Sequence, residues 1–201
     1  MLKSRRRLIV LAATVCAGAA LAVVLLTGWS SGGNSGGNSG VTDVAGSTSA
    51  VLYSAGHRPL VPDFTATTLT GSRLSFSSYR GQVVVVNFWG SWCAPCREEA
   101  PTLAVTARQY RSAGVSFLGV DVRDTTASAL AFAHSFGITY PSVSDTGSVI
   151  TLDFTSVVPI AGTPTTLVID RTGRVAGAVF GTATYQELSD ILAKVTGKTA
   201  G

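Results

Sequence analysis

From about residue 57 onward, apolar runs of strand length alternate with segments that favour helices. Residues 83–88 form a run rich in valine, which is typical of a central strand buried on both faces. A helix is predicted over residues 93–113, and residues 115–120 predict the next buried strand. This order of strand, helix and strand is typical of an α/β domain.

The alternation continues toward the C-terminus. A helix is predicted over residues 126–136, because Asp124 or Thr125 is suited to cap its first turn. The sequence therefore predicts an α/β fold with a central mixed β-sheet, helices on both faces and an N-terminal β-hairpin extension. The remaining predicted elements are two short strands within residues 64–76, which form that hairpin, two strands at 165–169 and 174–180 joined by a turn, and a closing amphipathic helix at 184–195.

The N-terminal segment has the pattern of an export or membrane signal. Residues 8–26 carry no charged side chain, a length close to the roughly 20 residues that span a bilayer. A basic cluster lies at residues 3–7, and no Lys or Arg follows until Arg58. The positive-inside rule then places the N-terminus in the cytoplasm and the rest of the protein outside it. Residues 1–29 are interpreted as a membrane anchor, with a cleaved secretory signal as the alternative.

Composition divides the remainder of the chain into two parts. Residues 30–56 are dominated by Gly, Ser, Asn and Thr, which predicts a flexible linker. Residues 57–199 form the predicted folded domain, which is expected to be a monomer. The net charge of +4 comes largely from the N-terminal basic cluster. Because no later basic patch is interleaved with aromatic residues, a nucleic-acid partner is not expected.

The candidate chemistry lies at Cys93 and Cys96, a C-x-x-C pair between a predicted buried strand and a predicted helix. A structural zinc site needs a second ligand pair, whereas His57 and His134 stand far apart, so neither a metal nor another cofactor is expected. A purely structural disulfide would close a very short loop and stabilise the fold little. The context therefore favours a redox-active pair. Cys16 lies within the apolar N-terminal run and is left out of the chemistry.

The position of the pair assigns a role to each sulfur. At a helix N-terminus, unpaired backbone N–H groups and the helix dipole favour an anion, so Cys93 is the predicted nucleophile. Cys96 lies one turn further along and is predicted to resolve the mixed disulfide. Pro95 suits the first turn, where its missing N–H has no cost.

Several motifs resemble the TlpA/ResA/CcmG group of thioredoxin-like proteins, over about residues 62–197. The resemblance implies a thioredoxin fold and a thiol-disulfide oxidoreductase. The stretch at 145–164 is longer than is usual for the group. The motifs that carry the resemblance are Asn87-Phe88-Trp89, Trp92-Cys93-Ala94-Pro95-Cys96-Arg97, Glu99-Ala100-Pro101, Gly119-Val120-Asp121, the segment Phe136 to Pro141, Gly162-Thr163-Pro164-Thr165-Thr166 and the segment Ile169 to Gly173.

The resemblance also implies roles for individual residues. Pro164 is expected to follow a cis peptide bond beside the redox pair, with the Thr163 backbone offered to an extended substrate. Asn87 stands where cytoplasmic thioredoxins carry a buried acid, and Glu99 matches a glutamate implicated in proton transfer. The alternative for Glu99 is a helix-start residue stabilised by the dipole. Trp92 is expected to contact substrate.

The expected function is reduction of disulfides in exported proteins with Cys pairs, including apocytochrome c, at the extracytoplasmic face of a bacterial membrane. This direction needs a membrane thiol-disulfide electron donor. The alternatives are an oxidase that donates its disulfide, a peroxiredoxin, and a non-catalytic tethered binding module. Whether the protein acts as an oxidase depends on the reduction potential of the pair. The Pro-x-x-x-Thr-x-x pattern expected of a peroxiredoxin does not precede Cys93.

Overall fold

A computed structural model of the chain describes residues 40–47 and 49–198. The predicted membrane anchor at residues 1–29 lies outside this described part. Within these two ranges, no helix has both the length and the apolar character that crossing a membrane requires.

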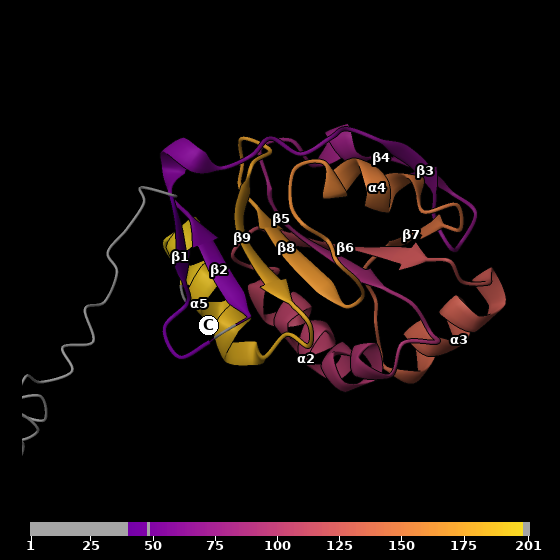
Figure 1. The fold of residues 1–201 in the computed structure, drawn as a ribbon. Coiled ribbons are helices and arrows are strands. Elements are labelled where there is room, and N and C mark those ends of the chain that lie inside the picture. The colour runs from indigo at the N-terminus through magenta and orange to yellow at the C-terminus, as the bar shows by residue number, and fades with distance from the viewer. Residues whose placement is uncertain (1–39, 48, 199–201) are drawn as a thin grey trace, which may run out of the picture. The chain divides into compact units, whose positions relative to one another are not determined.

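The centre of the domain is a seven-stranded mixed sheet with the order β1-β2-β9-β8-β5-β6-β7 (Figure 1). The parallel pairs are β5 with β6 and β6 with β7, and the other neighbours are antiparallel. The strands are β1 (Val41–Asp43), β2 (Ala50–Tyr53), β5 (Val83–Trp89), β6 (Val115–Val122), β7 (Ser142–Asp145), β8 (Thr165–Ile169) and β9 (Val175–Phe180), and a separate hairpin joins β3 (Thr65–Thr67) and β4 (Arg73–Ser75).

Both faces of the sheet are covered, as the sequence predicted. Figure 1 shows α2 (Ala94–Tyr110), α3 (Thr126–Ser135) and α5 (Tyr185–Thr196) on one face, and α4 (Val149–Thr155) with the β3–β4 hairpin on the other. Every residue of β5 is buried, because successive side chains enter the two cores in turn. Val83 and Val85 pack in one core cluster, and Val84, Val86 and Phe88 pack in the other.

The prediction of a flexible linker over residues 30–56 is wrong for its C-terminal part. Strands β1 and β2 form a hairpin there, β2 pairs with β9, and β1 is the edge strand of the sheet. Val44, Ala50 and Leu52 are buried, so the segment does have apolar positions to place in the core. The domain therefore begins before residue 57. The abundance of Gly, Ser and Thr concealed a short pattern of alternating apolar side chains.

The long stretch between β7 and β8 contains a helix that the sequence pattern did not predict. Helix α4 places Ile150 and Phe154 in the core. Phe154 is fully buried, with its ring 5.3 Å from that of Phe88 and 6.0 Å from that of Phe64, centroid to centroid. The Asp145 carboxylate accepts hydrogen bonds from the amides of Ile150 and Thr151, which positions the first turn. This stretch is thus an integral part of one core.

Candidate active site

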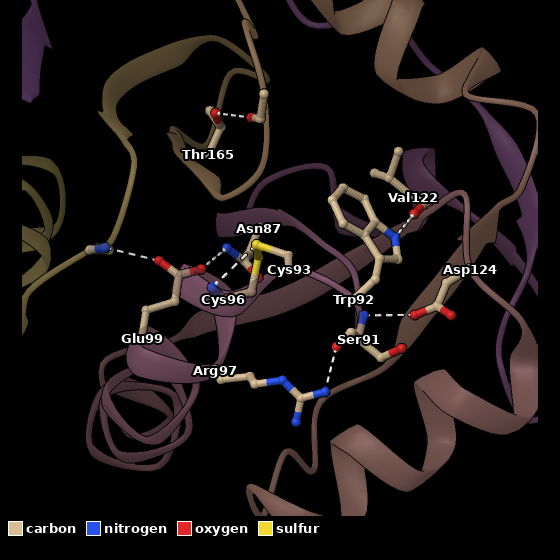
Figure 2. The surroundings of a disulfide bond; sticks show 12 residues. Asn87, Ser91, Trp92, Cys93, Cys96, Arg97, Glu99, Val122, Asp124 and Thr165 are labelled. Carbon is tan, nitrogen blue, oxygen red and sulfur yellow. Dashed lines mark hydrogen bonds between the residues drawn. A yellow bond between two sulfur atoms is a disulfide. The ribbon is translucent and has the colours of Figure 1, made fainter.

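Cys93 and Cys96 lie where the central strand β5 passes into helix α2, and they form a disulfide (Figure 2). Their Cα atoms are 5.3 Å apart. Cys93 has extended backbone angles and is the N-cap of α2, with Pro95 in the first turn. The predicted placement of this pair at a helix N-terminus is confirmed.

The helix terminus acts directly on the Cys93 sulfur. Cys93 Sγ accepts a hydrogen bond from the Cys96 amide at 3.2 Å. Such a donor, together with the partial positive charge of the helix N-terminus, stabilises a thiolate over a thiol. Cys93 keeps an exposed fraction of 4% against 1% for Cys96. The donor and the helix N-terminus therefore act on Cys93 Sγ, and both cysteines are buried.

Glu99 lies inside the protein, on the second turn of α2, with an exposed fraction of 1%. Its Oε1 accepts a hydrogen bond from the Asn87 amide at 2.8 Å, and its Oε2 accepts one from the Ala183 backbone N–H at 2.9 Å. Figure 2 shows the carboxyl directed toward the Asn87 amide in the surroundings of the disulfide. Burial raises the pKa of Glu99 to about 7, although both hydrogen bonds lower it. Glu99 can therefore hold or release a proton near neutral pH.

Trp92 is the exposed aromatic side chain of this site, at 52% exposure. Its indole Nε1 donates to the Val122 carbonyl at 3.0 Å (Figure 2). A Cβ at Gly90 would lie 2.5 Å from that nitrogen, so only glycine fits beneath the ring. Trp92 is thus a fixed, solvent-facing surface immediately before the redox pair.

The peptide bond between Thr163 and Pro164 is cis. Register places it beside the redox pair, because Thr165 at the start of β8 pairs with Phe88 near the end of β5. Figure 2 shows Thr165 in the surroundings of the disulfide, where it donates to the Gly162 carbonyl at 2.8 Å. A surface hollow of ≈ 290 Å³ is lined by residues 161–165 together with Phe180 and Gly181.

One group of contacts was not anticipated. Both backbone polar groups of Ser91 have side-chain partners. Asp124 Oδ2 accepts a hydrogen bond from the Ser91 N–H at 2.6 Å, and Arg97 Nη2 donates one to the Ser91 carbonyl at 2.7 Å (Figure 2). The sequence suggested Asp124 only as a helix cap, and Thr125 is the N-cap of α3. No local pattern indicates that a carboxylate 33 positions away reaches the Ser91 amide.

Comparison with known proteins agrees with this geometry. Residues 59–178 match the AhpC/TSA family. The chain is 39% identical to the thiol-disulfide oxidoreductase ResA of Geobacillus kaustophilus over 127 residues, which are 63% of this chain and 71% of that protein.

Solved structures similar to this chain include further thiol-disulfide proteins. A secreted thiol-disulfide isomerase from Corynebacterium glutamicum superposes with a TM-score of 0.69 at 28% identity, over 78% of this chain and 97% of that one. A DsbF homologue from Corynebacterium diphtheriae superposes with a TM-score of 0.68 at 31% identity, over 76% of this chain and 97% of that one. The fold is therefore the thioredoxin-like α/β fold that the motifs implied.

The pattern Pro-x-x-x-Thr-x-x that is expected of a peroxiredoxin does not precede Cys93. The ResA protein of Geobacillus kaustophilus has the name of a thiol-disulfide oxidoreductase, and the C-x-x-C pair at the helix start is the feature such chemistry needs. The chain belongs to the AhpC/TSA family, within its ResA-like group of thioredoxin-fold thiol-disulfide oxidoreductases.

Proposed function

We propose that this protein reduces disulfides in exported proteins, with Cys93 as nucleophile and Cys96 as resolving thiol. The observation that carries the proposal is the Cys93 sulfur at the N-cap of α2, bonded to Cys96 one turn behind it. Exported proteins with Cys pairs, apocytochrome c among them, are the proposed substrates, in line with the resemblance to ResA.

The proposed reaction starts from the reduced pair. The Cys93 thiolate attacks one sulfur of a substrate disulfide, which forms a mixed disulfide and releases the other substrate sulfur as a thiolate. Cys96 then gives up its proton and attacks the Cys93 sulfur, which releases the second substrate thiolate. The substrate gains two electrons, its two thiolates take up the proton released from Cys96 and one proton from the solvent, and the enzyme is left with the Cys93–Cys96 disulfide. A dithiol donor must return two electrons and two protons for the next cycle.

Glu99 is proposed to take the proton from Cys96 in the second step. Its carboxyl lies inside the domain on the same helix, three residues after Cys96. A pKa of about 7, raised by burial, leaves the group able to accept and release a proton under the working conditions. A helix-start glutamate stabilised only by the dipole would instead be expected at the exposed first turn.

Replacement of Glu99 by Gln tests this role. In the wild type we expect the ionisation of Glu99 near pH 7 to contribute to the pH dependence of alkylation of the reduced pair, and we expect this contribution to be absent in E99Q. Substrate release should slow by about 10²-fold, the lower range for loss of a proton-transfer group. Glu98→Gln, at an exposed position on the same helix, is the matched control and should keep the wild-type pH profile. An E99Q profile identical to the wild type would leave Glu99 with a structural role only.

The proposed substrate position is the surface between Trp92 and the Thr163–Pro164 loop. Trp92 offers an exposed, fixed aromatic face, and the loop borders a surface hollow. Pro164 has no N–H, and Thr163 is half-buried with its backbone available for pairing with an extended chain. These two features support binding of a peptide segment whose disulfide meets Cys93.

The proposed location is the extracytoplasmic face of a bacterial membrane, with residues 1–29 as anchor and the N-terminus in the cytoplasm. The support is the uncharged run at residues 8–26 behind a basic cluster. The proposed tether precedes β1, because residues 41–47 and 49–198 belong to the folded domain. The electron donor is proposed to be a membrane thiol-disulfide protein.

An insulin-reduction assay with the full chain in a non-ionic detergent tests the activity. Turnover with dithiothreitol is expected, and Cys93→Ser should abolish it. Inactivity of the wild type would favour a tethered binding module. The equilibrium potential of the pair then decides the direction: a value near the roughly −270 mV of thioredoxin supports a reductase, and one near about −120 mV, as in DsbA, would establish a disulfide-donating oxidase.

A further inference from the structure

A second buried carboxyl lies close to the redox site and takes no part in the chemistry described above. Asp121, near the end of β6, is fully buried opposite Trp89 of β5 and Ser144 of β7. Within the described part of the chain, no N–H or O–H group donates to either of its oxygens. An ionised carboxylate without donors in such a place costs several kcal/mol. Asp121 is therefore in an environment that favours its neutral, protonated form.

The neighbours of Asp121 strengthen this preference. The charged groups that face it are two further carboxylates, Asp124 in the loop after β6 and Asp145 at the end of β7. The oxygens of Asp145 are occupied by donors at the start of α4. Asp124 lies within hydrogen-bond reach of Asp121. Burial, followed by the charges of these two neighbours, raises the pKa of Asp121 to about 7.

Asp124 connects this proton to the redox pair. Its Oδ2 accepts the Ser91 amide at 2.6 Å and its Oδ1 accepts the Thr125 amide at 2.7 Å. Burial alone would raise the pKa of Asp124, but the hydrogen bonds from Ser91, Thr125 and Asp121 hold it below its usual value. Asp124 is thus the charged member of the pair, and it holds the peptide that leads into Trp92 and Cys93.

We propose that Asp121 is a positioning residue of the redox site, which keeps a proton, donates it to Asp124, and so allows Asp124 to hold the Ser91–Cys93 segment at the start of α2. The inference rests on the proposed function, because the consequence concerns Cys93 as nucleophile. Within the described residues, no three His, Cys, Asp or Glu side chains are placed to hold a metal ion, so the carboxyls are not arranged as a cation site.

The arrangement has a defined dependence on pH. When Asp121 loses its proton near pH 7, the donor to Asp124 disappears and two adjacent buried carboxylates repel each other. Because the pKa of the acid is raised in the folded state, its contribution to stability is present at low pH and is lost as the pH rises through about 7. The reactivity of Cys93 should then rise less with pH than thiol ionisation alone predicts.

The test compares Asp121→Asn with Asp121→Ala in the full chain in detergent. Both are made in an E99Q/C96S reference protein, so that Glu99 does not titrate and Cys93 has no partner sulfur, and alkylation is followed by mass spectrometry of the Cys93 peptide. The Asn side chain still donates to Asp124. The Cys93 alkylation rate of the D121N variant at pH 6 should therefore stay within about twofold of that of the reference protein, and its pH profile should have no inflection near pH 7. Ala removes the donor and should slow alkylation about tenfold, the order expected for one hydrogen bond to a charged group.

The outcomes separate the inference from the proposed function. A reference protein whose Cys93 reacts no faster than an ordinary thiol contradicts the role of Cys93 itself. The positioning role is overturned if Cys93 of the reference protein is reactive and the D121N and D121A variants alkylate at the same rate as each other. This holds whether both rates are unchanged or both are slowed. The proton can also be observed in the wild-type chain: the ¹³C shift of the Asp121 carboxyl, assigned by its loss in D121N, should titrate near pH 7. Titration near the usual Asp value of about 4 overturns the inference even if D121A does not fold.

Discussion

With serine in place of Cys96, the protein should remain covalently attached to its substrates. Cys93 keeps its position at the N-cap of α2, so it should still attack a substrate disulfide. Release then depends on thiols from solution, because the neighbouring sulfur is gone. Turnover of insulin should fall at least about 10³-fold, since an oriented intramolecular attack has a very large effective molarity.

Non-reducing gels provide the measurement, with mixed disulfides expected as bands that disappear on reduction. The C93S/C96S double variant is the control and should form none through the folded domain. A Cys16→Ser background removes the third cysteine of the chain, so that any remaining adduct is assigned to Cys93. Free substrate and unmodified C96S protein after incubation would contradict the assignment of the two sulfurs.

Phe154→Ala should have the largest effect on stability, with a loss of about 3–5 kcal/mol in the free energy of unfolding. The ring of Phe154 is fully buried and lies within 6.3 Å, centroid to centroid, of Phe64, Phe76 and Phe88. Truncation removes this apolar contact and leaves a cavity that the surrounding elements can only partly close. Urea unfolding followed by circular dichroism measures the change.

Leu152→Ala is the matched control on the same helix. Leu152 is 65% exposed, and its truncation should change the unfolding free energy by no more than about 0.5 kcal/mol. Phe154 and α2 lie on opposite faces of the sheet, so folded F154A protein should alkylate at Cys93 at the wild-type rate. A loss below about 1 kcal/mol would mean that α4 contributes little to the core.

Local sequence patterns account for much of the fold. The valine run at residues 83–88 predicted β5, since a strand buried on both faces needs an unbroken apolar run. Thr184 followed by Glu187 closes a capping box at the start of α5, a signal contained within one turn. The C-x-x-C pair was recognised because its two cysteines and the helix that polarises them are adjacent in the chain. Each of these features depends on residues a few positions apart.

Elements whose stability comes from distant partners could not be predicted in this way. Strand β2 is ordered because Ala50 pairs with Val179 of β9, and the turn beside it is held by Ser49 and Ser47 contacts with Glu187. Helix α4 is short, and its N-cap Ser148 makes no side-chain cap. It is held by the Asp145 carboxylate at the end of β7 and by Phe154 in a core assembled by other segments. Composition alone therefore classified the segment of β2 as linker and the segment of α4 as an irregular stretch.

The candidate site likewise combines features set by neighbouring residues with features that depend on distant parts of the chain. The sequence by itself determined that Cys93 and Cys96 lie at the start of a helix, because strand, turn and helix are contiguous there. Only the tertiary structure decided that Glu99 meets Asn87 and the Ala183 amide, and that Asp124 accepts the Ser91 amide. The physical reason is that a pKa depends on desolvation and on charges and donors a few ångströms away in space, and the chain brings those groups together only when it folds.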